Sequence, residues 1–461
     1  MFDEIHEECG VFGAYRVDNA ASITYYGLHS LQHRGQEASG IAVSDGENIT
    51  LQKGKGLTVD VFQREKLDSM VGRLAVGHVR YSTAGGQENE NIQPIVSKGH
   101  NGSLAIVHNG QIVNEKELRI ELENEGAIFQ GTSDSEIILH LIQKQKGTLK
   151  ERVMKTANRI EGAFSFLVMN EDTIYAVRDR HGLRPLSYAK SKDGYVISSE
   201  TCAFEVMGIY ESVDLKPGEI VEFHKGIVKH EFYSTDTDHH MCAMEYIYFA
   251  RPDSYIDGIS VHSSRITAGR ILAQTHPVDA DIVVGVPESG NAAAMGFALE
   301  SGIPYGTAFV KNSYVGRTFI KPKQSARESS VMVKLNVLRE IVRGKRVVMV
   351  DDSIVRGTTS ARIVKMLKDA GAKEVHVRIS SPPFKYPCYF GTDVPSSDQL
   401  PAFSHTVEQI AEMIGADSLG YLDLNRLSEL IDGDQGYCNA CFSGDYPLDP
   451  PKEDIRGDYD K

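Results

Sequence analysis

The chain lacks any apolar run that approaches the roughly 20 residues of a membrane-spanning helix. Its N-terminus, Met1–Glu8, is acidic and has no apolar core segment, which excludes a secretory signal peptide. Together the two absences predict a cytoplasmic protein that has no membrane partner.

Basic residues are also in short supply. The 49 Lys and Arg are outnumbered by 63 Asp and Glu, which gives a formal net charge of −14. Nucleic acid binding requires a basic face, so this balance argues against nucleic acid as a main partner. Small anionic substrates are not excluded, because they need only a local basic pocket.

Cysteine is scarce as well, with six residues in a chain of 461. Disulfides are rare in cytosolic proteins, so metal-binding or catalytic roles are the expected ones. The six are Cys9, Cys202, Cys242, Cys388, Cys438 and Cys441. Cys202 has no partner in the pattern and is expected to be a small apolar filler.

The length of the chain suffices for two or three domains. Short apolar or alternating runs, separated by turn residues, fill the first half and predict packed sheets with helices on the outside. The expected strands are Gly10–Tyr15, Gly40–Val43, Leu74–His78, Leu104–His108, Phe164–Met169, Thr173–Val177 and Tyr195–Ser199, and Ser133–Gln145 is expected to be a helix.

The pattern changes after the polar stretch Thr235–His240. From Ala280 onward strands and helices alternate, which predicts a parallel sheet with crossover helices. The expected strands are Asp281–Val286, Ile303–Val310, Arg346–Val350 and Glu374–Ile379, and the expected helices are Gly290–Glu300 and about Ser360–Ala370. The last residues, Pro447–Lys461, are rich in Pro, Asp and Lys and are expected to form a tail.

The most informative segment is Val347–Thr359, where an apolar strand ends in two acidic residues before a loop of small residues and a helix. Backbone N–H groups in such a loop can surround a phosphate, and the helix N-terminus adds partial positive charge. The two carboxylates suit ribose hydroxyls or hydrated Mg²⁺. The alternative is an ordinary α/β strand with an acidic end. The full run resembles the phosphoribosylpyrophosphate (PRPP) signature of the type I phosphoribosyltransferases, which implies PRPP contacts from Asp351, Asp352, Ser353, Gly357, Thr358 and Thr359.

Two further segments of the second half suit an anionic substrate. Val286–Gly290 joins a strand to a helix and is similar to the pyrophosphate loop of the same fold. Lys311–Arg327 carries five cations. This segment is either a solvated basic loop or a mobile lid that closes over PRPP and excludes water. Its candidate PRPP contacts are Lys311, Arg317 and Lys321.

Cys9 lies just inside the N-terminus, before Gly10 at the start of an expected strand. If residues 1–8 are removed, the free α-amino group of Cys9, with an ordinary pKa near 8, can act as the general base for its own thiol. A buried structural cysteine is the alternative. Together with Leu31–Glu37 and His78–Thr83, the run Cys9–Gly13 resembles the class II, N-terminal nucleophile glutamine amidotransferases.

Both halves together resemble the glutamine PRPP amidotransferase family, and the likeness extends from Cys9 to about Cys441 through Tyr248–Ser254 at the domain junction. The resemblance implies an α/β fold of two domains: an N-terminal nucleophile hydrolase-type αββα glutaminase domain and a type I phosphoribosyltransferase domain with a parallel sheet. It also implies glutamine-dependent amination of PRPP, with ammonia passing through an internal tunnel. The expected limits are a propeptide at 1–8, domains at 9–235 and 236–445, and a tail at 446–461.

The family also implies residue roles. Cys9 would be the nucleophile, Asn109 and Gly110 the oxyanion hole, and Arg80 and Asp134 the partners of the glutamine α-carboxylate and α-ammonium. Ser289, Asp351 and Asp352 would help hold Mg²⁺. One departure is visible: the family pattern usually has Arg where Ser313 stands, which places the anion affinity of the lid in question.

The remaining cysteines include a C-x-x-C at Cys438 and Cys441, with Cys242 and Cys388 as isolated partners. Four thiolates suit either Zn²⁺ or an iron–sulfur cluster, and the spacing does not choose between them. One branch of the family has cysteines at matching places and carries a [4Fe–4S] cluster and a cleaved propeptide. The resemblance therefore implies a structural [4Fe–4S] cluster here.

Two other classes of protein are the alternatives to a PRPP amidotransferase. Another class II amidotransferase, such as one that makes amino sugars, would lack Asp351–Asp352 and would usually have Cys directly after Met1. A PRPP-sensing regulator would contain a basic DNA-binding module and would lack a nucleophile, whereas this chain is acidic and has Cys9. The family further implies glutamine and PRPP as substrates, purine nucleotides as feedback inhibitors and a homotetramer.

Overall fold

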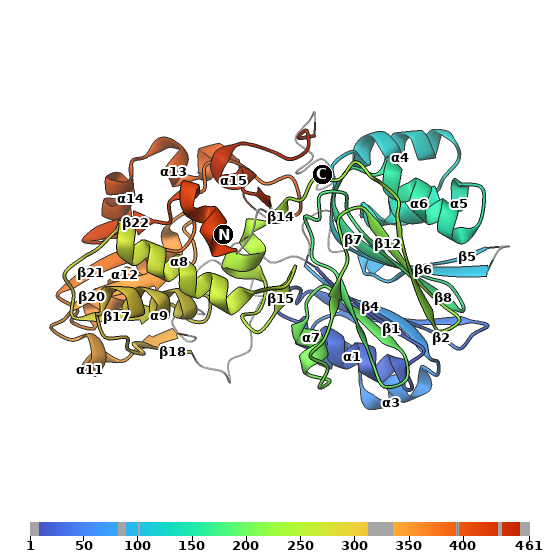
Figure 1. Ribbon diagram of the computed structural model, residues 1–461, viewed down its shortest axis with the longest axis horizontal. Helices are drawn as coiled ribbons and strands as arrows, with labels where there is room; N and C mark the ends of the chain where they lie inside the picture. The colour runs from blue at the N-terminus through green and yellow to red at the C-terminus, as the bar shows by residue number, and fades with distance from the viewer. Residues whose placement is uncertain are drawn as a thin grey trace.

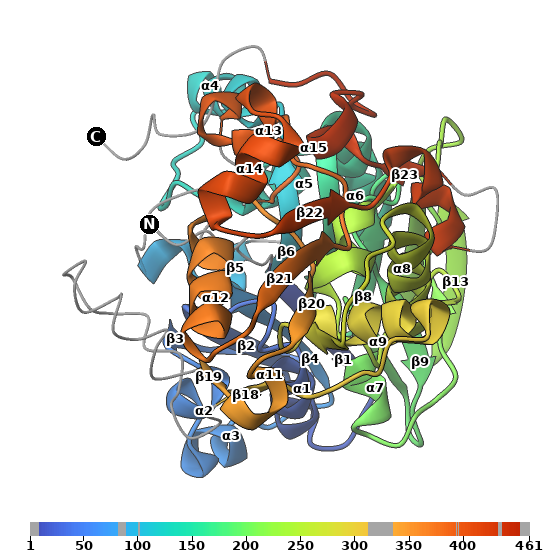
Figure 2. The ribbon, with the colours of Figure 1, turned by 90° about the vertical axis from the view of Figure 1, so that its left-hand side faces the viewer.

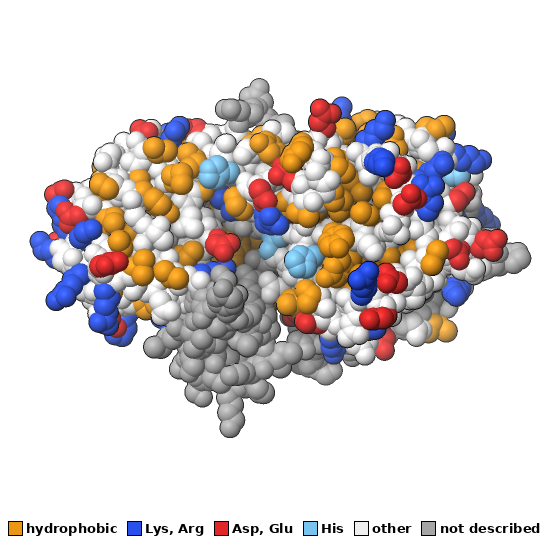
Figure 3. Space-filling model, turned by 90° about the horizontal axis from the view of Figure 1, so that it is seen from below, with side chains coloured by type: hydrophobic (Ala, Val, Ile, Leu, Met, Phe, Trp, Pro, Cys, Tyr) orange, Lys and Arg blue, Asp and Glu red, His pale blue; other side chains and the backbone are white. Residues whose placement is uncertain are grey.

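The computed structural model describes residues 9–81, 89–99, 102–311, 335–392, 394, 396–431 and 436–451. It has two lobes, which hold the N-terminal and the C-terminal half of the chain (Figure 1). On the face shown in Figure 3, acidic and basic side chains are interspersed over both lobes. Within the described ranges, no helix has both the length and the apolar character needed to cross a membrane.

Two sheets face each other in the N-terminal lobe (Figure 1). The first has the order β11 (Val213–Asp214), β9 (Ser187–Lys190), β10 (Tyr195–Ser198), β1 (Gly10–Tyr15), β4 (Leu74–Arg80), β2 (Ala38–Ser44) and β3 (Ile49–Lys55). The second has the order β13 (Ile227–Phe232), β12 (Glu219–His224), β8 (Thr173–Arg178), β7 (Gly162–Met169), β6 (Gly102–Ile112) and β5 (Ile95–Gly99). The seven strands expected in this half are confirmed, and several of them run further than expected.

Helices cover the outer face of each sheet, so the lobe has four layers. The first sheet carries α1 (Ala20–Ser30), α2 (Thr58–Val61), α3 (Arg64–Ser69) and α7 (Cys202–Glu205), and the second carries α4 (Glu115–Asn124), α5 (Ser135–Lys144) and α6 (Leu149–Arg159). Alternate residues of a strand point to opposite faces. In β1, Val11 and Tyr15 therefore pack between the sheets, whereas Phe12 and Ala14 pack against the outer helices. The expected αββα layering is confirmed.

The C-terminal lobe, which faces the viewer in Figure 2, is built on a parallel sheet of four strands. Their order is β17 (Ile282–Gly285), β20 (Arg346–Asp351), β21 (Glu374–Ile379) and β22 (Ser418–Tyr421). One face packs on α8 (Val261–Thr275) and α9 (Gly290–Ser301), and the other on α12 (Thr358–Asp369) and α14 (Val407–Ile414). This confirms the expected parallel sheet with crossover helices.

The expected strand Ile303–Val310 is wrong over most of its length. Only an isolated bridge joins Tyr305 to Val283 of β17, and the chain then leaves the sheet. Proline has no N–H to donate, so Pro304 supplies only its carbonyl to Val283. A separate strand, β18 (Phe309–Lys311), instead pairs with β19 (Leu335–Val337) as an antiparallel ribbon.

Short elements complete the C-terminal half. They are the π-helix η2 (Glu245–Phe249), the strand pairs β14 (Met241–Cys242) with β23 (Tyr437–Cys438) and β15 (Tyr255–Ile256) with β16 (Ile259–Ser260), and the helices α11 (Arg339–Val342), η3 (Ser397–Gln399), α13 (Pro401–Ser404), η4 (Leu424–Leu430) and α15 (Ala440–Ser443). In Figure 1, β14 lies between the two lobes.

Candidate functional site

Cys9 lies at one end of the first sheet, immediately before β1. The antiparallel register sets Gly10 opposite Val79, so Cys9 falls beside the end of β4, where Arg80 is located. Its Sγ lies 3.5 Å from the carbonyl oxygen of Tyr81, and its own carbonyl oxygen accepts a hydrogen bond of 3.1 Å from Arg34 Nε. The sheet register therefore brings together the expected nucleophile and the expected carboxylate-binding guanidinium.

Asn109 and Gly110 lie on β6 of the facing sheet. Asn109 is fully buried, and neither its Nδ2 nor its Oδ1 has a hydrogen-bond partner among the residues that the structure describes. Such a group is costly unless a ligand completes it. Gly110 has φ 137°, and a Cβ at this position would come within 1.9 Å of the Ala163 carbonyl oxygen, so only glycine fits. These features suit the predicted oxyanion hole.

Asp134 lies against the same strand. Its Oδ2 accepts the backbone N–H of Ile112 at 3.0 Å, and its Oδ1 accepts the Ser135 hydroxyl at 3.3 Å. His108 of β6 has its Nδ1 3.7 Å from Asp134 Oδ1. The structure thus places Asp134, Asn109 and Gly110 within one short stretch of the sheet.

A histidine connects β6 to the sheet that carries Cys9. His78 Nε2 lies 3.1 Å from the carbonyl oxygen of His108. Burial lowers the pKa of His78 to about 3 and also lowers the pKa of His108. The His78 ring is therefore neutral and forms a hydrogen bond between the sheets, whereas the His108 Nδ1 lies 3.0 Å from the Ser135 hydroxyl of α5.

A buried ion network behind Cys9 was not foreseen from the sequence. Arg34 donates to Glu200 Oε1 at 2.6 Å and to both carboxylate oxygens of Glu245, at 2.9 and 2.7 Å. All three side chains are almost fully buried. Burial alone would raise the pKa of Glu200, but the charges of His33 and Arg34 outweigh it and hold that pKa well below its ordinary value. Because Glu245 belongs to η2, the network ties the C-terminal half of the chain to the backbone of Cys9.

Arg265 of α8 binds the backbone of η2. Its guanidinium donates to the carbonyl oxygens of Tyr246, Tyr248 and Ala250 at 2.8, 2.9 and 2.7 Å. Burial lowers the pKa of Arg265 to about 10, and the charge of Asp352 opposes that shift. These three carbonyl groups are distributed along η2 and the residue after it. The helix is thus held by Arg34 through the Glu245 side chain and by Arg265 through its backbone.

The expected PRPP loop lies at the C-terminal edge of the parallel sheet, which is where ligands bind in such sheets. Asp352 follows the last residue of β20 and is almost fully buried. Its Oδ1 accepts the Ser289 hydroxyl at 2.5 Å, and its Oδ2 accepts the hydroxyl of Ser353. Burial raises the pKa of Asp352 despite these hydrogen bonds. Asp351, whose Oδ1 accepts the N–H of Asp352 at 3.0 Å, completes the acidic pair.

The loop 353–357 leads into α12 as expected. Gly357 has φ 87° and precedes Thr358 and Thr359 at the start of the helix, where N–H groups can meet an anion. On the neighbouring connection, a Cβ at Gly290 would come within 2.4 Å of the Val350 carbonyl oxygen. This close approach brings Ser289 to the end of β20.

The donor set at this edge suits Mg²⁺, which takes oxygen ligands and is usually held by one or two carboxylates together with substrate phosphates. Of the expected lid, the structure describes Lys311, whose Nζ lies 3.3 Å from Glu288 Oε1 at an exposed position. Arg317, Lys321 and Ser313 lie outside the described residues.

The four expected cluster cysteines meet. The parallel register of β14 and β23 sets Cys242 opposite Cys438, and one small pocket is lined by these two with Cys388 and Cys441. Burial, and next the charge of Cys388, raise the pKa of Cys438 to about 12. Within the described ranges, however, no group of three or more His, Cys, Asp or Glu is arranged as a metal site. The donor set fits a thiolate-bound metal, since a buried thiol loses its proton only when a cation takes the proton's place.

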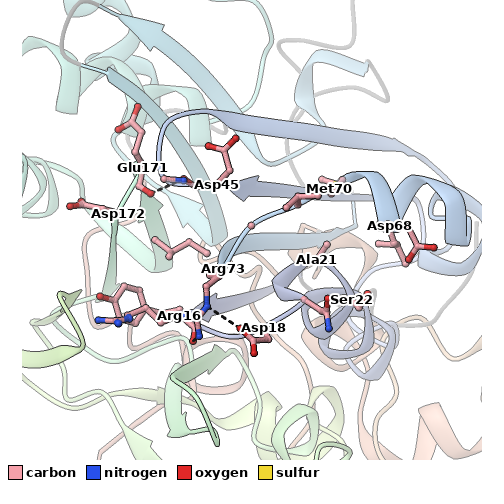
Figure 4. Close-up of a pocket in the computed structure, with 18 of the residues that line it drawn as sticks. Arg16, Asp18, Ala21, Ser22, Asp45, Asp68, Met70, Arg73, Glu171 and Asp172 are labelled. Atoms are coloured by element: carbon pink, nitrogen blue, oxygen red, sulfur yellow. Dashed lines mark hydrogen bonds and ion pairs between the residues drawn. The ribbon is translucent and has the colours of Figure 1, made fainter.

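A separate groove of about 810 Å³ lies at the other end of β1 (Figure 4). Arg16 follows the last residue of β1, whereas Cys9 precedes the first, so the strand separates the two places. Cationic and anionic side chains both line the groove, and Arg73 Nε lies 3.1 Å from Asp18 Oδ1. The Ser44 hydroxyl, which also lines the groove, donates to the Glu171 carbonyl oxygen at 2.7 Å. Volume alone does not make this groove the reaction centre, because the predicted nucleophile and the predicted phosphate loop both lie elsewhere.

Comparisons with known proteins match a different domain family to each half of the chain. A glutamine amidotransferase domain family model matches residues 78–206, and a phosphoribosyl transferase domain model matches residues 262–380. The amidophosphoribosyltransferase of Bacillus subtilis (strain 168) is 50% identical over 96% of this chain and 95% of its own length, and that of Archaeoglobus fulgidus is 48% identical over 97% and 100%. The solved glutamine PRPP amidotransferase from B. subtilis, complexed with ADP and GMP, matches with a TM-score of 0.90 over 95% of this chain and 97% of the solved chain.

Proposed function

We infer, from the fact that this chain belongs to the amidophosphoribosyltransferase family, that its two sites carry the two halves of one reaction. The family's reaction converts glutamine, PRPP and water into 5-phosphoribosylamine, pyrophosphate and glutamate, and it opens de novo purine synthesis. The chain is an enzyme of this class, a pentosyltransferase with a glutamine amidotransferase domain. What remains to be assigned is the role of each residue and of each cofactor.

For the glutamine half we propose Cys9 as the nucleophile. With residues 1–8 removed, the α-amino group of Cys9 takes the thiol proton, Sγ attacks the side-chain amide carbon of glutamine, and a glutamyl thioester forms as ammonia leaves. Asn109 and Gly110 would stabilise the oxyanion of the tetrahedral intermediate, at about 3 kcal/mol for each donor. The observation that carries this proposal is the buried amide of Asn109 on β6, which lacks a partner within the described part of the chain. Asp134 binds the same strand through the N–H of Ile112.

Substrate orientation in this half would come from two charged residues. Arg80 would pair with the glutamine α-carboxylate, which a guanidinium can bind through two parallel hydrogen bonds. Asp134 would accept the α-ammonium. Water then hydrolyses the thioester and releases glutamate.

For the PRPP half we propose that Asp351, Asp352 and Ser289 help hold one Mg²⁺. Mg²⁺, when bound, would neutralise the departing pyrophosphate. Ser353, Gly357, Thr358 and Thr359 would bind the 5-phosphate, and Lys311, Arg317 and Lys321 of the lid would add positive charge and exclude water. Ammonia channelled from Cys9 then replaces pyrophosphate at C1 of the ribose. Positioning and electrostatics would supply most of the rate.

One assay of wild-type enzyme tests the coupling. With both substrates present, glutamate release should be matched by PRPP consumption, mole for mole, because the ammonia is used where it arrives. Release of glutamate without any loss of PRPP would contradict the proposal at its centre.

For the cysteine pocket we propose a [4Fe–4S] cluster with a structural role. Its ligands would be Cys242, Cys388, Cys438 and Cys441, which join three segments that are distant in the sequence. The support is the convergence of four thiols, one buried and three partly buried, on one pocket, together with the likeness to the iron-bearing branch of the family. The same likeness supports removal of the propeptide 1–8.

Protein purified anaerobically is expected to be brown and to hold about four irons per chain. Cys438→Ala should lose the colour and most of the iron and should lower the melting temperature, because the cluster ties the segments together. Cys202→Ala, which removes a buried thiol outside the pocket, should keep the colour and the iron. Colourless wild-type protein with stoichiometric zinc would reverse the assignment of the metal.

Regulation and assembly are proposed from the relatives. The B. subtilis enzyme was solved with ADP and GMP, and a second match at TM-score 0.92 is described as the allosteric regulatory enzyme of purine biosynthesis. We propose purine nucleotides as feedback inhibitors of this chain and a homotetramer as its assembly. The cytoplasmic location and the domain limits 9–235 and 236–445, with a tail at 446–461, stay predictions.

A further inference from the structure

The loop that presents Asp134 is held through its backbone by buried side chains. Glu136 accepts the N–H groups of Gln130 and Gly131, at 2.8 and 2.9 Å. Asn91 Oδ1 accepts those of Thr132 and Ser133, at 2.9 and 3.0 Å. Four consecutive N–H groups thus donate hydrogen bonds to two side chains, which fix the path of the loop.

The carbonyl side of the loop is held by Arg119 of α4. Its guanidinium donates to the carbonyl oxygens of Gly131 and Ser133, at 3.2 and 3.3 Å, and lies 4.1 Å from the centroid of the Phe129 ring. Glu115 lies 3.9 Å from the guanidinium. Burial, and next the charge of Asp134, raise the pKa of Glu115 to about 8, so Glu115 is largely protonated near neutral pH and adds little negative charge beside Asp134.

Asn91 binds the loop from the segment that precedes β5. It is 1% exposed, and its Nδ2 also donates to Thr132 Oγ1 at 2.9 Å. A Cβ at Gly131 would come within 2.3 Å of Asn91 Oδ1, so the close approach depends on glycine. Two residues further along the chain, Gln93 binds the backbone of His108, where Oε1 accepts the N–H at 2.6 Å and Nε2 donates to the carbonyl oxygen at 3.2 Å.

We propose that Asn91 is a positioning residue for recognition of the substrate's α-ammonium group. It does not touch the ammonium itself; it fixes the loop so that the Asp134 carboxylate stays in place beside Asn109 and Gly110. The inference rests on the proposed role of Asp134 in glutamine binding. A displacement of about 1 Å in a binding group can cost about 100-fold. Loss of the partner that orients a metal-binding side chain costs about 10- to 100-fold, and we expect a similar range for the partner that orients Asp134.

The test compares glutamine with 4-carbamoylbutanoate, which is glutamine without its α-amino group. Asn91→Ala is expected to lower kcat/KM for glutamine by roughly 10- to 100-fold, mainly through KM, and to leave hydrolysis of the analogue and ammonia-dependent amination unchanged. Asn91→Asp keeps the acceptor oxygen for the two N–H groups and should recover most of the loss. Asn158→Ala, which removes another amide that donates to a backbone carbonyl group, serves as the matched control.

The outcomes separate this inference from the proposed function. If Asp134→Asn leaves the preference for glutamine over the analogue unchanged, the role of Asp134 is wrong. If Asp134→Asn abolishes the preference and Asn91→Ala does not change it, only the role of Asn91 is wrong. An equal loss for both substrates in Asn91→Ala would show general damage and overturn the inference. Should Asn91→Ala fail to fold, Thr132→Val removes one hydrogen bond of Asn91, and an unchanged preference there would overturn the inference as well.

Discussion

Cys9→Ala is expected to abolish product formation from glutamine and to spare product formation from ammonia. The substitution removes the Sγ that would form the thioester, and loss of a nucleophile typically costs several orders of magnitude in rate. The proposed PRPP site lies at the edge of the parallel sheet in the other lobe and does not involve this thiol. The measurement is PRPP consumption with glutamine or with ammonium chloride at alkaline pH as the nitrogen source.

Two controls accompany this variant. Cys202→Ala removes a fully buried thiol of α7 and should keep both activities. The intact mass of the wild-type protein should show loss of residues 1–8, because the α-amino group of Cys9 is needed as the base. An equal loss of both activities in Cys9→Ala would contradict separate sites, and full activity in a chain that retains residues 1–8 would contradict the proposed base.

Asp352→Asn is expected to lower kcat/KM for PRPP by about 100-fold or more, because it removes one negative charge from the expected Mg²⁺ site. The two hydroxyl groups that donate to the carboxylate, those of Ser289 and Ser353, would then share a single acceptor oxygen. Hydrolysis of glutamine should persist in part. A titration with Mg²⁺ measures the effect directly, and the half-saturating concentration should rise.

The matched control is Asp369→Asn at the end of α12. Asp369 is exposed and pairs with Lys365 at 2.8 Å, and exposed pairs of this kind contribute about 0–1 kcal/mol. It should leave the PRPP kinetics and the Mg²⁺ titration unchanged. Unchanged PRPP kinetics in Asp352→Asn over the same titration would remove this residue from the site.

Much of the fold follows from local sequence patterns. β1 has the predicted bounds, Gly10–Tyr15, because a run of apolar residues buried on both faces has strand character along its whole length. α12 begins two residues earlier than predicted, because Gly357 adopts a left-handed conformation and lets the helix begin at Thr358. The prediction of a strand at Ile303–Val310 failed because the chain leaves the edge of β17 after a single bridge at Tyr305, next to Pro304, which has no N–H to donate.

The residues that support the sites could not be read from the sequence in the same way. Arg34 meets Glu245 across 211 positions, and Asn91 meets Ser133 across 42. A polar side chain that is destined for burial looks like any surface residue until its partner is known. The only available signal was the position of Arg34 within the run Leu31–Glu37.

The order of residues along this chain was sufficient for most of the expected strands and for the acidic pair before its small-residue loop, since each depends on neighbours within a few positions. The four thiols are far apart in the sequence, and only the family resemblance grouped them. Folding alone decided that Arg80 falls beside Cys9, that the Asn109 amide is buried, and that the Asp134 loop is held by Asn91 and Arg119. Those outcomes depend on strand register and on long-range hydrogen bonds. The residues involved are far apart along the chain and come into contact only when the chain has folded.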